Sequence, residues 1–226
     1  VTRSNNDYKL FINGALEAST TSSTAIISSS STIFCIGSAH NRDVEEPFAG
    51  YISNARFVKG TALYTSDFTV PTEPLTAVSG TTLLTLQDAT IQDNSASSHS
   101  ITNNGATVTE IAPFGAALID RAGSVYASGS YDYLRANTGY HSDFAFGTGD
   151  FTVEGWVYPL SANDNFFDTR TTLTNAGFGF GIGNGTSTKP GVCDGAGINW
   201  ELQSTGAYVR RNEWTYIAFV RKSQVL

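Results

Sequence analysis

A period-two alternation of apolar and polar residues is the feature that most constrains the fold of this chain. The clearest case is 151–158, where Val153, Gly155 and Val157 share one face of an extended strand that Pro159 ends. About a dozen such short patterns follow one another, and helical periodicity is scarce. The pattern predicts an all-β fold, a jelly-roll sandwich of two antiparallel sheets with little or no helix.

Turn residues separate the predicted strands. Asn13-Gly14 and Asn104-Gly105 are strong short-range signals, and each predicts a β-hairpin. The segment 64–74 contains Pro71 and Pro74 and is predicted to return across the sandwich as a loop.

The two ends of the chain resemble parts of the same strand. Residues 220–223 (Val-Arg-Lys-Ser) can be overlaid on 1–4 (Val-Thr-Arg-Ser), and the chain contains no methionine. These features predict a unit cut from a longer or repeating protein, in which the ends of neighbouring copies meet. Self-association is predicted to involve Val1, Arg3, Val220, Arg221 and Leu226.

Charge and composition limit the partners and the location of the protein. The net charge of −7 and the scattered distribution of the 13 Lys and Arg residues argue against nucleic acid as a partner. No run approaches the roughly 20 apolar residues of a membrane span. Only 15% of residues are charged, while Ser, Thr, Asn and Gly are abundant. This composition predicts an extracellular protein or one on a cell or virion surface.

The two cysteines, Cys35 and Cys193, allow two interpretations. They could form a disulfide, as in a secreted protein, or stay as two buried thiols. Their spacing excludes a zinc site built from paired cysteines.

Four segments carry a family resemblance that spans most of the chain. They are 151–159, 213–221, 8–14 and 48–57, which read Phe-Thr-Val-Glu-Gly-Trp-Val-Tyr-Pro, Glu-Trp-Thr-Tyr-Ile-Ala-Phe-Val-Arg, Tyr-Lys-Leu-Phe-Ile-Asn-Gly and Phe-Ala-Gly-Tyr-Ile-Ser-Asn-Ala-Arg-Phe. Together they resemble the laminin-G-like branch of the concanavalin A-like lectin/glucanase superfamily, of the type found in bacterial and phage surface proteins. The resemblance is specific for the fold and poorly specific for function.

The order of these segments differs from the family. In the family, the segments that match 8–14 and 48–57 come last, whereas here they come first. The resemblance therefore implies that 1–80 is the C-terminal half of one module and 81–226 the N-terminal half of the next. Two assemblies follow. Either the chain closes on itself as one permuted module, or 1–80 of one copy completes 81–226 of another, which would propagate head-to-tail as a filament.

Catalysis is not predicted. A glycosidase on this fold needs two carboxylates across a cleft, and Glu154 has no second acid at the expected alternate positions. His40, His99 and His141 lie in separate loops and are predicted to be unrelated polar surface residues. The chain is therefore predicted not to be an enzyme.

Calcium is the cofactor left open, because related folds often hold it between loops. The candidate ligands are Asp88, Asp132 and Asp150, in turn-like contexts that Asp93 and Asp143 share. Turn capping is the other interpretation of these carboxylates. Aromatic residues that could stack on sugar rings, with core packing as their alternative role, are Tyr126, Tyr131, Tyr133, Tyr140, Trp156, Trp200 and Trp214.

Two functions are predicted. The first is a structural repeat unit of an extracellular fibre, stalk or tandem adhesin, which assembles head-to-tail with identical copies. The alternative is a carbohydrate-binding, lectin-like module of a secreted or phage surface protein, with glycans as partners.

Overall fold

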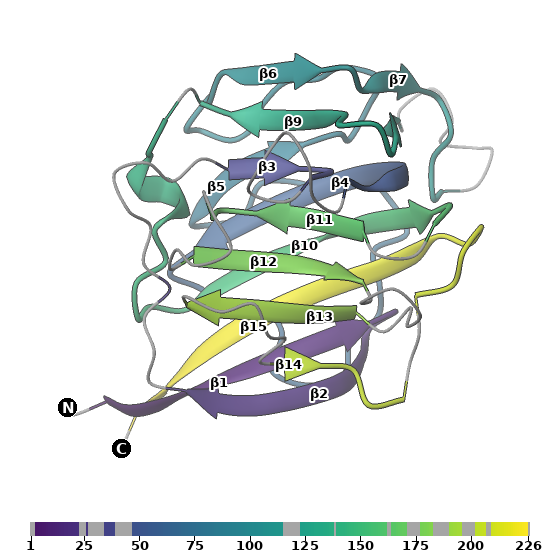
Figure 1. The fold of residues 1–226 in the computed structure, drawn as a ribbon. Helices are drawn as coiled ribbons and strands as arrows, with labels where there is room; N and C mark the ends of the chain where they lie inside the picture. The colour runs from purple at the N-terminus through teal and green to yellow at the C-terminus, as the bar shows by residue number, and fades with distance from the viewer. Residues whose placement is uncertain are drawn as a thin grey trace.

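The computed structural model is a sandwich of two antiparallel β-sheets, which confirms the predicted all-β class (Figure 1). It describes residues 3–22, 26, 34–38, 47–114, 123–137, 139–161, 164–170, 177–182, 190–195, 202–206 and 209–225. For 3–6, 164, 177–178, 190–195 and 224–225 it describes the backbone alone. Among these residues, helical structure is limited to the short 3-10 helix η2 (Ser142–Phe144).

The larger sheet has eight strands, in the order β2-β1-β15-β10-β4-β8-β7, with β5 paired to β4 beside this path. Their bounds are β1 Arg3–Ile12, β2 Ala15–Ser22, β4 Ala49–Lys59, β5 Thr81–Thr85, β7 Thr107–Thr109, β8 Ser124–Ser128, β10 Phe151–Pro159 and β15 Thr215–Val225.

The smaller sheet has seven strands, in the order β14-β13-β12-β11-β3-β9-β6, and lies in front of the larger one in Figure 1. Their bounds are β3 Phe34–Ile36, β6 Ile101–Asn104, β9 Tyr133–Ala136, β11 Asp164–Asp168, β12 Gly177–Ile182, β13 Pro190–Gly195 and β14 Leu202–Gln203.

Alternate residues of the strands fill the core between the sheets. In β10, Phe151, Val153 and Val157 are all 0% exposed, as the alternation predicts. Aromatic rings meet edge-to-face across the layers, and the ring centroid of Phe57 lies 5.2 Å from that of Phe167. The sandwich therefore holds together through an apolar core contributed by both sheets.

The terminal strands of the described chain are neighbours. β1 pairs with β15 from Arg3 opposite Val225 to Ile12 opposite Ile217, so both ends emerge at one corner (Figure 1). β4 also lies beside β10, and β3 lies between β11 and β9. Strands from the first part of the chain thus fill places in both sheets of the same molecule. Of the two assemblies considered from the sequence, this is the one in which the chain closes on itself. The permuted order of the segments stays a prediction.

One predicted hairpin is confirmed and the other is wrong. Asn13-Gly14 joins β1 to β2, which pair with each other. The chain also turns at Gly105, but β6 pairs with β9 and β7 pairs with β8, in different sheets. The Asn103 amide bonds both the N–H and the C=O of Ala106, at 3.0 and 2.8 Å. This side-chain bridge closes the turn, and the chain then crosses from one sheet to the other.

Residues 61–80 cross the outer face of the larger sheet, and we call this segment the strap. Tyr64 and Phe68 of the strap pack on Phe11 and Tyr216, whose side chains are 0% exposed on that face. The predicted return loop at 64–74 lies within it. The strap gives the sheet a second apolar layer on the side opposite the main core.

Candidate functional site

The outer face of the larger sheet also carries three tyrosines on neighbouring strands. Tyr51 on β4 lies opposite Tyr126 on β8 and, on its other side, opposite Tyr158 on β10. Their chain neighbours Ile52 and Val157 are 1% and 0% exposed in the core. Because successive residues of a strand point to opposite faces, the three tyrosines point outward.

Trp214, the residue before β15, extends this line of rings. Its ring centroid lies 5.5 Å from that of Tyr158 and 6.5 Å from that of Tyr51. Tyr51 in turn lies 5.6 Å from Tyr158 and 5.2 Å from Tyr126. All four residues are half-buried. We call Tyr51, Tyr126, Tyr158 and Trp214 the aromatic row, whose rings pack on one another while part of their surface stays accessible.

Backbone contacts hold the aromatic row in place. Leu160 N donates to Ala49 O at 2.7 Å, and Asn212 N donates to Pro159 O at 2.9 Å. Asn212 has a φ of 62°, a left-handed conformation that asparagine tolerates, at the turn just before Trp214. The row therefore rests on sheet strands and one fixed turn.

Such a row suits a ligand with apolar faces and polar edges. Tyrosine and tryptophan offer an apolar ring together with an O–H or N–H group, and sugar rings have the complementary character. Thr107 on β7 is exposed and lies opposite Tyr126, so it adds a hydroxyl at one end.

Glu154 lies on the same face but is buried beneath the strap. It is 0% exposed; its Oε1 accepts from Arg56 Nε at 2.7 Å, and its Oε2 accepts from the Tyr216 hydroxyl at 2.5 Å. Arg56 Nη1 also donates to Thr76 O of the strap at 2.7 Å. We call Glu154, Arg56 and Tyr216 the buried ion network. Its carboxylate anchors the strap, so it gives no support to glycosidase chemistry.

Burial and charge shift the pKa values around Glu154. Burial alone would lower the pKa of Arg56, but the charge of Glu154, its hydrogen bond to Arg56 and the nearby Tyr216 and Tyr64 together outweigh burial, and the pKa is raised. Burial, reinforced by Glu154, raises the pKa of Tyr216 and of Tyr64 above the ordinary tyrosine value. The surroundings of Glu154 thus favour a charged arginine and protonated side chains at Tyr216 and Tyr64.

Two of the predicted calcium ligands lie in separate turns. Asp88 Oδ1 accepts from Thr90 N at 2.8 Å, and Asp132 Oδ2 accepts from Ser128 N at 2.7 Å and Ser128 Oγ at 2.6 Å. Each carboxylate closes its own local turn.

The third, Asp150, precedes β10. Its Oδ1 accepts from Ser223 N at 2.7 Å, and its Oδ2 lies 3.0 Å from Lys222 Nζ. Burial alone would raise the pKa of Asp150, but the hydrogen bonds from Ser223 and the charge of Lys222 lower it. The structure does not bring the three aspartates together, and calcium binding by any of them stays a prediction.

The residues predicted for self-association lie within the sheet pairing of a single chain. Val220 and Arg221 are both 0% exposed, and Arg221 Nε donates to Gly149 O at 2.7 Å. The backbone of Arg3 pairs with Val225 of the same chain. Val1 and Leu226 lie outside the described residues. Contacts of these residues with a second copy stay a prediction.

A disulfide within one chain is excluded by the sheet register. Cys35 lies opposite Asp168, Asp168 opposite Gly179, and Gly179 opposite Cys193, on four successive strands. Three strand spacings separate the cysteine Cα atoms by about 14 Å. A disulfide needs them within about 7 Å. The disulfide interpretation is therefore wrong for the closed chain, in which the buried Cys35 fits the thiol alternative.

Sequence analysis found two members of the aromatic row, Tyr126 and Trp214, and missed Tyr51 and Tyr158. The available signal was the alternation in 48–58 and 151–158, which places both tyrosines at outward positions. The other aromatic candidates lie elsewhere: Trp156 is 9% exposed, Tyr131 and Tyr140 are 45% and 44% exposed, Tyr133 is half-buried and Trp200 lies outside the described residues.

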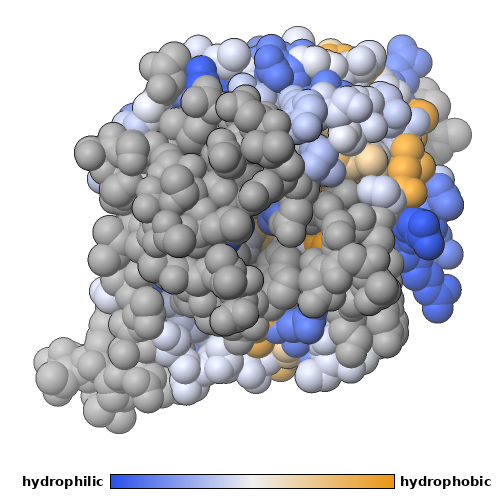
Figure 2. Space-filling model, in the orientation of Figure 1, coloured by the Kyte–Doolittle hydropathy of each residue, from blue (hydrophilic) through white to orange (hydrophobic). Residues whose placement is uncertain are grey.

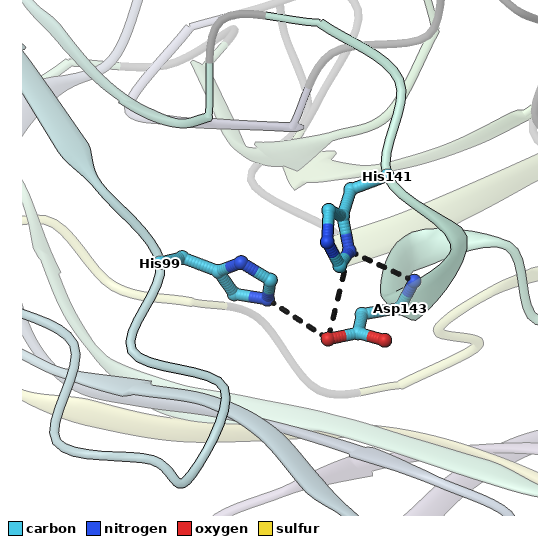
Figure 3. Close-up of side chains that lie close together, drawn as sticks. All are labelled: His99, His141 and Asp143. Carbon is cyan, nitrogen blue, oxygen red and sulfur yellow. Dashed lines mark hydrogen bonds and ion pairs between the residues drawn. The ribbon is translucent and has the colours of Figure 1, made fainter.

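The prediction that the histidines are unrelated surface residues is wrong for His99 and His141. His99 and His141 meet at Asp143, from two loops that the sequence separates (Figure 3). His99 is 7% exposed, so it is not a surface residue. His40 lies outside the described residues. The sequence contained one local signal of this cluster, because Asp143 lies two positions after His141.

The molecule is thus an all-β sandwich with an accessible aromatic row on the outer face of its larger sheet. Residues 128–226 match a laminin G family model described as the concanavalin A-like lectin/glucanases superfamily. The resemblance is confirmed for this segment, which is similar to that superfamily. No curated protein and no solved structure is found to match the chain. Among the described residues there is no helix with the length and apolarity needed to cross a membrane.

Proposed function

We propose that this protein binds glycans and that the aromatic row is its binding surface. The observation that carries the proposal is the alignment of Tyr126, Tyr51 and Tyr158 on three neighbouring strands, with Trp214 beside them. Packed, half-buried rings on a rigid sheet lose little freedom when a ligand stacks on them. The superfamily match of 128–226, which includes Tyr158 and Trp214, supports the proposal.

The ligand class follows from length and charge. The three strands span two strand spacings, about 10 Å, which is long enough for more than a single sugar ring. The net charge of −7 disfavours polyanionic chains such as sulfated or uronic-acid glycans. We therefore infer that the ligand is a neutral oligosaccharide or polysaccharide.

A glycan array followed by calorimetry on the glycans that bind tests this proposal. We expect Tyr126→Ala and Trp214→Ala to weaken binding at least about fivefold, since truncation of an aromatic residue that carries binding energy costs more than about 1 kcal/mol. Tyr140→Ala is the matched control, because Tyr140 is 44% exposed and lies outside the row. The absence of any bound neutral glycan, or equal losses in all three variants, would overturn the proposal.

We propose a second function, a structural unit of an extracellular fibre, stalk or tandem adhesin on a cell or virion surface. The pairing of β1 with β15, β4 with β10 and β3 with β11 and β9 favours it, because each pair joins 1–80 to 81–226. The same pairings between copies would make a head-to-tail polymer. In the closed chain they are satisfied internally, so the glycan-binding proposal has the stronger geometric support.

Boiled and unboiled gels, light scattering and electron microscopy test the second proposal. A head-to-tail polymer should scatter as a species of many chain masses and appear as filaments. A monodisperse single-chain mass at every concentration, with no filaments, would overturn assembly through separate copies. Turnover on a panel of polysaccharides would contradict the prediction that the chain is not an enzyme.

A further inference from the structure

Two loops at one end of the sandwich bring His99, His141 and Asp143 together. His99 lies in the segment that connects β5 to β6, and His141 and Asp143 lie at the start of η2. In Figure 3 the His99 ring approaches the Asp143 carboxylate from the left and His141 from above, and both contact the same oxygen. One ligand atom from each of the three side chains lies within 4.8 Å of the other two.

The distances approach those of a transition-metal site. His99 Nε2 lies 3.1 Å from Asp143 Oδ2, and His141 Nδ1 lies 3.6 Å from the same oxygen. In a tetrahedral zinc site, metal–ligand bonds of about 2.0–2.2 Å place neighbouring ligand atoms about 3.3 Å apart. Small side-chain adjustments would therefore bring the three atoms into coordination range.

The His99 ring carries the decisive observation. Its side chain is 3% exposed, yet Nε2 has no hydrogen-bond partner among the described residues. The contact of 3.1 Å with Asp143 lacks hydrogen-bond direction. A buried ring nitrogen of this kind is costly unless something binds it. It lies close to the carboxylate oxygen that the other histidine also contacts.

Groups around the cluster orient the two rings. The Asn137 side-chain amide lies 2.8 Å from His99 Nδ1. The contacting atom is the amide donor Nδ2, so Nδ1 accepts from it and the ring proton lies on Nε2. Binding of an ion through Nε2 requires the amide to turn by about 180° and present Oδ1, which keeps the proton on Nδ1 and the lone pair on Nε2. On the other side, His141 Nδ1 accepts from Asp143 N at 3.3 Å, so this nitrogen carries the lone pair of the ring, and an ion would replace the N–H as its partner.

Packing fixes the cluster against the core. The Phe144 ring lies 5.1 Å from that of His99 and stacks on Phe34 at 4.7 Å. Ser97 Oγ donates to Asp143 Oδ2 at 2.8 Å, which joins the two loops through the carboxylate. The three side chains thus rest on supported loops, as binding residues need to.

We propose that His99, His141 and Asp143 bind a divalent transition metal ion of the zinc type. Two imidazoles and one carboxylate suit zinc, copper, nickel or iron, whereas calcium and magnesium take oxygen ligands. Three protein ligands leave a fourth position open, on the side where the His141 side chain is 42% exposed. The ion ties the two loops together and can accept one ligand from solvent or from a bound molecule.

Calorimetry and metal analysis of untagged protein test the site, with Zn²⁺ as the probe and Ca²⁺ as the competitor. We expect one Zn²⁺ per chain and a melting temperature that rises with Zn²⁺, since the ion binds the folded state. His141→Ala and Asp143→Asn should each weaken Zn²⁺ binding by about 100-fold or more, because loss of an outer partner alone costs about 10–100-fold. Asn137→Ala removes such an outer partner and should therefore weaken Zn²⁺ binding by about tenfold or more.

Asp88→Asn is the matched control, since Asp88 caps its own turn away from the cluster, and it should bind Zn²⁺ like the unmodified chain. Co²⁺ should give visible absorption bands of nitrogen and oxygen coordination that both ligand variants lose. Near-UV circular dichroism verifies that each variant is folded. Failure of the unmodified chain to bind Zn²⁺, equal binding by the folded ligand variants, or preference for Ca²⁺ at these residues would overturn the proposal.

Discussion

At the residue scale, the buried ion network is the most sensitive point of the molecule. Removing the Glu154 carboxylate leaves the Arg56 guanidinium, in a side chain 7% exposed, without its charge partner. Such a loss costs about 3–5 kcal/mol. We expect Glu154→Ala to lower the free energy of unfolding by that amount in urea titrations. Glu154→Gln keeps an oxygen acceptor and should cost less; an unchanged stability of Glu154→Ala would contradict the structural role.

The tyrosines beside this network predict a loss of stability in alkaline solution. The raised pKa values of Tyr216 and Tyr64 keep both hydroxyls protonated in the folded chain, whereas unfolded tyrosines ionise near about pH 10. Above that pH the folded state binds more protons, so stability falls as the pH rises. Urea midpoints between about pH 8 and 11 measure the fall. Tyr216→Phe should show a shallower slope, and an identical slope would refute the assignment.

Sequence reasoning reached these residues only in part. It recognised that Glu154 lacks a second acid, but its partners Arg56 and Tyr216 are 98 and 62 positions away. The same holds for His99, which meets Asp143 through folding of the chain. Alternation tells which face a side chain occupies, and it carries no information on which distant strand lies beside it.

At the element scale, the β1–β2 turn and the strap depend on each other. Gly14 has a φ of 81°, and a Cβ on it would lie 2.0 Å from the Phe68 carbonyl oxygen of the strap. Phe68 N also donates to Gly14 O at 2.9 Å. The turn therefore needs glycine both for its left-handed backbone and for close approach of the strap.

We expect Gly14→Ala to destabilise the chain by more than about 1–2 kcal/mol, the cost of the left-handed backbone alone. Hydrogen exchange should also speed up in the strap amides. Gly139→Ala is the matched control, because nothing lies within 4 Å of a Cβ at Gly139. Equal effects of the two substitutions in urea titrations would show that the strap does not depend on this contact.

The elements differ in how far the sequence predicts them. Asn13-Gly14 and the strand at 151–158 follow from turn chemistry and alternation, and both are observed. Asn104-Gly105 carries the same turn signal, yet the short strands on either side pair with longer neighbours in different sheets. β11 lies in a segment where sequence analysis proposed no strand, because Asp164–Asp168 lacks clean alternation. Its place is set by pairing with β3 and β12.

At the scale of the whole molecule, the sandwich class was predictable because it depends on the period of many strands at once. The strand neighbours were not, and these neighbours separate the two cysteines and close the chain on itself. The order of segments remains the testable part of the permutation hypothesis.

A rearranged chain tests that hypothesis. This chain begins at Val78 and runs to Val225, continues through a short linker to Arg3, and ends at Ala77. The new ends, Val78 and Ala77, are both exposed. The joined ends, Val225 and Arg3, already lie opposite each other in the sheet. We expect it to fold with the near-UV circular dichroism of the original chain and a similar free energy of unfolding. A chain joined in this way that fails to fold would contradict the proposed family order.

The pairing of β1 with β15 also decides how the molecule responds to tension. Force applied at Arg3 and Val225 acts at the open end of an antiparallel pair, so the bonds between the strands carry the load one after another. The pair would open like a zipper toward Ile12 and Ile217, where the last bonds between the strands lie. A closed module pulled by these ends would therefore yield early and lengthen, acting as an extensible link rather than a stiff one.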